Sequence, residues 1–353
     1  MSTGIDILPS VSLQLACRSS QSHESYFHLR VAALFIILVG STLGALVPVL
    51  LSRRANAQSG ARNVPLAWLD FAKHFGSGII LGTAFIHLLA PGIEALGNPC
   101  LSEGWRKYPY ALGLCLSSIL AIYVVEVVTM RYGAGQHPEL DVQLDSSSSA
   151  QFPFSDANVF PAEQIEEIQL AEASSQAIQT VEEVKSAANH HICANIIGLA
   201  ILEFGAILHS VLIGLTLAVD PKFKVLFAVL VTHQVFEGLG IGSRLATVRF
   251  PVRYVHLPVI GAVVFGMSTP LGMAVGLAMR SWYNANDAGA LVISGVLDSL
   301  SAGILMYTAL VELLGREILF NEKLMKGPTL KLSLAVVWMF LGCCIMALLG
   351  KWV

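Results

Sequence analysis

The sequence is poor in charged side chains, which make up 13% of its 353 residues, whereas 55% of the residues are hydrophobic. A soluble domain carries about 25% charged residues. This shortage excludes an ordinary soluble protein and predicts a chain embedded in a lipid bilayer.

Other absences narrow the function. The formal net charge of −3 offers no basic surface for nucleic acid. The six cysteines form no Cys-x-x-Cys motif, and no motif indicates an organic cofactor. Cys17 and Cys100 lie in polar surroundings, where a disulfide and two free thiols are about equally expected.

The sequence contains long apolar stretches. Each is long enough to span about 30 Å of hydrocarbon at about 1.5 Å per helical residue. They cover 27–51, 71–96, 109–130, 194–219, 223–246, 256–280, 288–313 and 331–350. The predicted fold class is an all-α polytopic membrane protein with eight transmembrane helices.

Basic residues predict the orientation. With the N-terminus outside, the 21 Lys and Arg residues divide into 13 on the cytosolic side and 8 outside. Both termini are then extracytoplasmic. The expected organisation is an outer tail (1–26), helices 1–3 (27–130), a cytosolic, acidic and disordered loop (131–191), and helices 4–8 (192–353).

The fifth segment carries the strongest chemical signal. His233 and Glu237 lie one helical turn apart and share a face, with Gln234 at its edge. An ionisable residue at the centre of a membrane helix costs about 2.5–3.5 kcal/mol. A purely structural His–Glu contact is disfavoured because an apolar pair would pack without this cost. Imidazole and carboxylate groups are ligands that zinc prefers.

Polar residues in the neighbouring segments are weaker candidates. The fourth segment holds Glu203, His209 and Ser210, and Glu203 lies too far around the helix to share an ion with His209. In the second segment, His87 and Glu94 could line a pathway or an entrance, or be interfacial polar residues.

Two more groups are ambiguous. Asp298 in the seventh segment fits a pathway or relay group as well as a structural tie between helices. His190 and His191, at the end of the acidic loop, could bind metal weakly, although a solvated loop is the better interpretation.

Four stretches together resemble a known family. They are Gly78–Leu89, Leu202–Gly214, His233–Gly240 and Asp298–Tyr307. In them the chain is similar to the Zrt/Irt-like (ZIP) metal transporters, and most similar to their fungal and plant branch. The resemblance covers all eight segments and the variable loop.

The resemblance implies a ZIP-type bundle that moves a divalent metal into the cytosol across the plasma membrane. The cargo is usually zinc and in some members iron or manganese. The metal lies between helices four and five, and an elevator-like motion is implied. By position, His209, His233 and Glu237 match the transport ligands, and His87 matches a residue lining the pathway.

The chain departs from members that hold two metals. Ser210, Ile213, Gln234 and Thr269 stand where those members have Asn or acidic residues. We therefore expect one principal site, completed by Glu203, Ser210, Gln234 or water.

Other functions stay open on the sequence alone. A membrane metal hydrolase is disfavoured because no His-Glu-x-x-His occurs. A proton-coupled carrier of an organic solute, or a sensor that binds metal without moving it, fits some of the same residues. The glycine-rich helix faces suit packing within one chain or between two copies in a homodimer.

Protons should compete with the metal. The pKa of a free histidine side chain is about 6.5, and only the neutral imidazole binds metal. Zinc affinity should therefore fall as the pH drops below about 6.5. Zinc titrations of the purified protein at neutral and mildly acid pH check this, and equal affinities would contradict it.

Overall fold

The computed structural model describes residues 27–57, 64–134, 196–220, 223–248, 250, 255–279 and 288–352. Within these residues the secondary structure is helical and no strand occurs. The chain divides into one unit that comprises 1–124 and 196–353 and a second unit, 125–195. The packing described below lies within the first unit.

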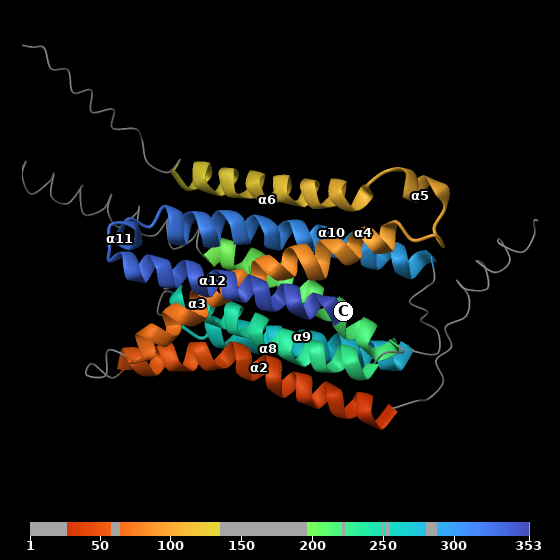
Figure 1. Cartoon of the computed structure of the whole chain (residues 1–353), viewed down its shortest axis with the longest axis horizontal. Coiled ribbons are helices and arrows are strands. Elements are labelled where there is room, and N and C mark those ends of the chain that lie inside the picture. The colour runs from red at the N-terminus through yellow and green to blue at the C-terminus, as the bar shows by residue number, and fades with distance from the viewer. Residues whose placement is uncertain are drawn as a thin grey trace, which may run out of the picture. The chain divides into compact units, whose positions relative to one another are not determined.

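Among the residues that the structure describes, eight helices are long and apolar enough to cross a membrane, as the sequence predicted. They cover Phe27–Arg54, Ala67–Leu96, Tyr110–Thr129, Ile196–Val219, Phe223–Thr247, Leu257–Met279, Ala288–Leu319 and Thr329–Trp352. The corresponding elements in Figure 1 are α2 (Phe27–Ala57), α3 (Val64–Gly82), α6 (Tyr110–Ala134), α8 (Phe223–Thr247), α9 (Leu257–Met279), α10 (Ala288–Tyr307) and α12 (Thr329–Leu349). The Ile196–Val219 helix is called the fourth helix below.

Two of the described spanning helices contain a π-helical stretch. The second continues from α3 through a π-helical stretch, η1 (Thr83–Leu89), into α4 (Ala90–Leu96). The seventh continues from α10 into a longer π-helical stretch, η3 (Thr308–Leu319). Pro91 in the first turn of α4 cannot donate a backbone hydrogen bond, so the irregular turn just before it follows from the sequence. Such stretches are frequent at functional sites.

Close glycine contacts join α2, the fourth helix, α8 and α9, which we call the ligand-bearing group. A Cβ on Gly242 of α8 would collide with the carbonyl of Ala45 in α2, and one on Gly272 of α9 with the carbonyl of Val211 in the fourth helix. Figure 1 shows α2, α8 and α9 running alongside one another. Glycine lets these backbones touch.

The remaining helices, α3–η1–α4, α6, α10–η3 and α12, form what we call the flanking group. A Cβ on Gly78 of α3 would meet the carbonyl of Met339 in α12. One on Gly92 of α4 would lie 2.7 Å from Ser299 Oγ in α10. The two groups meet where α3 crosses α8 and where the fourth helix packs on α10, since a Cβ on Gly205 would lie 2.8 Å from Ile304 Cγ2.

The outward faces of the bundle are apolar. On α6, Leu112, Leu116 and Leu120 are each about half exposed, and Phe340 of α12 is exposed as well. Contiguous apolar surface of this kind is unfavourable in water and suits contact with acyl chains. The lipid bilayer is therefore the surroundings of this chain.

Some expectations fall outside the described residues. These are the tail 1–26 and residues 135–191 of the predicted loop 131–191, which include His190 and His191. Cys100 is disulfide-bonded, but Cys17 is not described, so their pairing stays a prediction. The orientation of the termini likewise stays a prediction.

The crossing at Gly242 should be sensitive to a single methyl group. We expect Gly242→Ala to destabilise the protein by about 1–3 kcal/mol because the new Cβ overpacks the α2 backbone. Gly104→Ala is the matched control, since its Cβ meets only Ser102 Oγ, at 4.0 Å. The monodisperse fraction left after heating measures the effect. Equal loss in both variants would contradict the packing role.

Candidate metal site

His233 and Glu237 face the same way from α8. Their side chains are 0% and 1% exposed, and His233 Nε2 lies 3.4 Å from Glu237 Oε2. The spacing of four residues places them on one helical face. The predicted pair is therefore present, buried in the middle of a spanning helix.

The fourth helix adds a third group to this pair. His209 is 1% exposed, and its ring centroid lies 5.6 Å from that of His233. One ligand atom from each of His209, His233 and Glu237 lies within 4.8 Å of the others. We call these three residues the triad. Two imidazoles and a carboxylate at this separation can converge on one divalent cation.

The polar atoms of the triad are poorly satisfied by protein. Both ring nitrogens of His209 and His233 and both carboxylate oxygens of Glu237 have no hydrogen-bond partner among the described residues. An unsatisfied buried polar group costs about 1–3 kcal/mol. A bound cation would engage one atom of each residue, so this donor set fits a metal ion.

Packing behind the triad fixes the two helices that carry it. On α8, the backbone of Val235 lies against Gly44 of α2, where a Cβ would sit 2.6 Å from the Val235 carbonyl oxygen. On the fourth helix, Gly214 touches the α9 backbone at Thr269. Both ligand-bearing helices are thus held by neighbours in their own group.

Ser210 and Gln234 lie beside the triad and bind each other. Gln234 Nε2 donates to Ser210 Oγ at 3.2 Å, and both residues are 0% exposed. Gln234 Oε1 has no partner among the described residues. The bond links the fourth helix to α8, and whether either residue also completes a metal site stays a prediction.

His87 approaches the triad from the flanking group. Its ring centroid lies 4.8 Å from that of His233, edge to face. Its Nε2 lies 3.0 Å from the carbonyl oxygen of Met346 in α12. The resemblance implied that His87 lines the pathway, and the structure sets it directly beside His233; its role stays a prediction.

The other predicted residues lie apart from the triad. Glu203 is half-buried on the fourth helix, against Gly261 of α9, where a Cβ would lie 2.7 Å from its Oε1. Glu94 is exposed and Asp298 is half-buried. None of the three joins the set of converging ligand atoms among the described residues.

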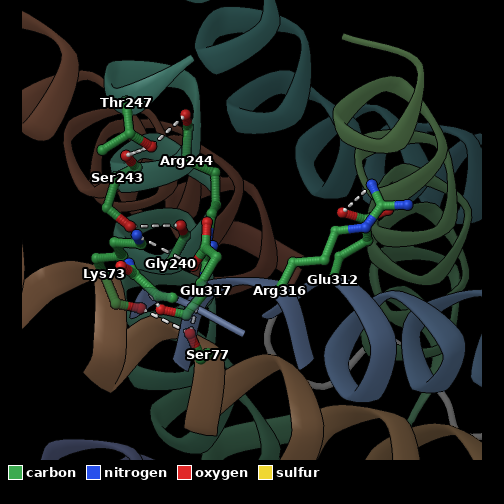
Figure 2. Close-up of polar contacts among 10 residues, drawn as sticks. Lys73, Ser77, Gly240, Ser243, Arg244, Thr247, Glu312, Arg316 and Glu317 are labelled. Atoms are coloured by element: carbon green, nitrogen blue, oxygen red, sulfur yellow. Dashed lines mark hydrogen bonds and ion pairs between the residues drawn. The ribbon is translucent and has the colours of Figure 1, made fainter. Parts of the chain in front are cut away.

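Sequence reasoning missed a polar cluster on α8 beyond Glu237. Arg244 pairs with Glu317 of η3 and donates to Ser77 of α3, and Lys73 Nζ lies 3.3 Å from Glu317 Oε2 (Figure 2). A signal was present, because Arg244 follows Glu237 by seven residues and so shares its helical face.

Comparison with known proteins agrees with this geometry. A family model described as ZIP Zinc transporter matches residues 27–350. The chain is 37% identical over 360 residues to zinc-regulated transporter 1 of Schizosaccharomyces pombe, covering 93% of this chain and 86% of the relative. It is 32% identical over 414 residues to zinc-regulated transporter 2 of Saccharomyces cerevisiae, covering 95% and 97%.

A relative named for another metal also matches. The chain is 28% identical over 402 residues to Fe(2+) transport protein 3, chloroplastic, of Arabidopsis thaliana, covering 98% of this chain and 92% of the relative.

The eight apolar helices, the family model and the relatives named as zinc transporters together define the class of this protein, a membrane metal transporter. The match over nearly the whole chain makes the family plain, and the chain belongs to the ZIP zinc transporters. The resemblance seen in the sequence is confirmed.

Substitutions of Glu237 and Glu203 should have different effects on zinc affinity if only Glu237 binds the metal. Loss of an outer partner of a metal ligand costs about 10–100-fold in affinity, so Glu237→Gln, which removes a ligand charge, should weaken zinc binding by at least about 100-fold. Glu203→Gln on the fourth helix is the matched control and should change it by less than about threefold, since Glu203 lies outside the triad. Calorimetric zinc titration measures both, and similar losses would contradict the assignment.

Proposed function

We propose that this protein takes up zinc into the cytosol, and that His209, His233 and Glu237 hold the ion during transit. The observation that carries the proposal is the convergence of their ligand atoms within 4.8 Å inside an apolar bundle. The named zinc transporters among its relatives support zinc as the cargo.

The ligand set suits transport better than permanent binding. Structural zinc sites are closed by four protein ligands, whereas a site with three keeps a position open. Two neutral imidazoles and one carboxylate also leave a net positive charge on the bound complex. Both features weaken binding, and a transporter must release its ion.

The direction of zinc transport and the membrane that holds the protein are inferred separately. The excess of basic residues on one side predicts that side to be cytosolic. Lys73 and Arg244, both counted on that side, share the partner Glu317. Uptake across the plasma membrane is the assignment that fits this orientation and the family.

Iron is the second candidate cargo, because one relative is named as an Fe(2+) transport protein. The general affinity order of divalent metals places zinc above iron at nitrogen and oxygen sites. Manganese lies lower still. Zinc is therefore the first cargo to test, with iron and manganese as competitors.

No homodimer is proposed. The glycines that suggested a second copy are used within this chain: a Cβ on Gly238 would lie 3.0 Å from the Ser41 carbonyl oxygen, and one on Gly240 would lie 3.1 Å from Gly76 Cα.

Zinc flux through the triad can be measured directly. The purified chain in proteoliposomes should show saturable uptake of radioactive zinc. His233→Ala and Glu237→Ala should each reduce the flux at least about 100-fold, as expected when a metal ligand is lost from the site. Excess unlabelled zinc should compete better than iron or manganese.

The controls use the same substitutions on exposed residues. His256→Ala and Glu322→Ala, both at exposed positions, should keep the parent flux. A parent protein that binds zinc but moves none would favour a sensor instead. Flux that survives both triad variants would show that the ion takes another route.

A further inference from the structure

The triad is sealed inside the bundle, so an ion can leave it only if helices move. His209, His233 and Glu237 are each at most 1% exposed. A site that is reached from one side and emptied to the other requires alternating access. This inference rests on the proposed function, and it concerns what holds one end of the bundle closed.

Arg244 lies between the triad and one end of α8. It follows Glu237 by seven residues, which is two helical turns and about 10 Å along the axis, on the same face. It is 4% exposed. A divalent cation that passed along this face would meet a buried guanidinium of like charge, and their repulsion would be strong in a medium of low dielectric.

The guanidinium is held by two residues from other helices. Arg244 Nη1 pairs with Glu317 of η3, and Nη2 donates to Ser77 Oγ of α3 (Figure 2). Arg244 Nε has no partner among the described residues. The contacts are therefore strong but few, and they all reach across from α8.

These contacts join the two helix groups. Arg244 belongs to the ligand-bearing group, whereas Ser77 and Glu317 belong to the flanking group. Beside them Gly240 of α8 crosses Gly76 of α3 so closely that a Cβ on Gly76 would collide with Gly240 Cα. Glycines have no side chains that interlock, so the contact between Gly76 and Gly240 does little to fix the position of α3 along α8. Directional polar contacts have to fix it instead.

Two other ion pairs of the described residues nearby lie within the flanking group. Lys73 of α3 and Glu317 of η3 both belong to the flanking group, and their nitrogen and oxygen lie 3.3 Å apart. Arg316 pairs with Glu312 at 2.9 Å within η3 itself. Figure 2 shows Arg244 and Lys73 reaching Glu317 from different helices.

We propose that Arg244, Glu317 and Ser77 form a latch that keeps the Arg244 end of the bundle closed and that must open for the ion to be released. A buried ion pair contributes little net stability because desolvation offsets its attraction. It does favour one arrangement of the two groups. Once the groups separate, water can solvate both charges, so the latch can open at moderate cost.

The test measures water access at this end in the full-length protein. Ser243→Cys places a thiol beside Arg244 at a buried position, where the hydroxyl donates only to the Gly240 carbonyl of its own helix, at 2.7 Å. A charged, water-soluble methanethiosulfonate reagent is applied to the detergent-purified protein. Peptide mass spectrometry then gives the labelling rate at position 243, whatever happens at the native cysteines.

In this background, Glu317→Gln should raise the labelling rate by about tenfold, which is within the range of coupling between contacting residues. Ser77→Ala leaves no charge unpaired and should raise it by about threefold. Lys73→Gln is the matched control, since it removes an ion pair to the same carboxylate within one group, and should leave the rate unchanged. Calorimetric zinc affinity should stay at the parent value in all of these variants.

The double variant Arg244→Gln with Glu317→Gln distinguishes two causes of faster labelling. One is the loss of the link between the groups, and the other is the unpaired charge that Glu317→Gln leaves on Arg244. It should remain as accessible as Glu317→Gln alone, because the link between the groups is still missing. Labelling that returns to the parent rate in this variant, or that rises equally in Lys73→Gln, would overturn the latch. Should the Glu317 variants fail to fold, an unchanged rate in Ser77→Ala would overturn it.

Failure of the latch and failure of the proposed function are distinguishable. Labelling needs no transport, so it tests the latch even if the parent carries no zinc. Conversely, zinc flux in the parent that depends on the triad would stand even if every latch variant labelled at the parent rate.

Discussion

The structure depends on one costly arrangement, the burial of two imidazoles and a carboxylate inside an apolar bundle. Each of the triad side chains, His209, His233 and Glu237, is at most 1% exposed, and their ligand atoms lie within 4.8 Å of one another. Each polar atom left unsatisfied costs about 1–3 kcal/mol. One divalent cation would engage all three side chains at once, so an arrangement that is unfavourable for packing suits the metal site proposed here.

Burial of the triad requires that the surrounding helices hold its residues in place. The helices that carry the triad must be held firmly, and glycines such as Gly44 and Gly214 bring α2 and α9 into backbone contact with them. Release of an ion from so buried a site would require helices to move, and the latch that we propose would oppose that movement. Arg244 pairs with Glu317 across the boundary between the two groups, beside the close Gly76–Gly240 crossing.

Much of this could be predicted from the sequence. Apolar length identified all eight spanning helices, and the four-residue spacing put His233 and Glu237 on one face. Contacts between helices could not be derived in this way. The position of His87 beside His233 and the pairing of Arg244 with Glu317 depend on how distant segments cross. The π-helical stretches η1 and η3 also change which residues share a face; Pro91 accounts for η1, but no sequence signal indicates η3.

X-ray absorption at the zinc edge of the zinc-loaded protein tests the central claim most directly, because it reports the atoms bound to the metal. We expect two imidazole nitrogens at about 2.0–2.1 Å and carboxylate or water oxygen at about 2.0–2.2 Å from the zinc. The imidazole signal should halve when His209 is replaced by alanine. Sulfur at about 2.3 Å, or a spectrum without imidazole, would show that the triad does not hold the metal.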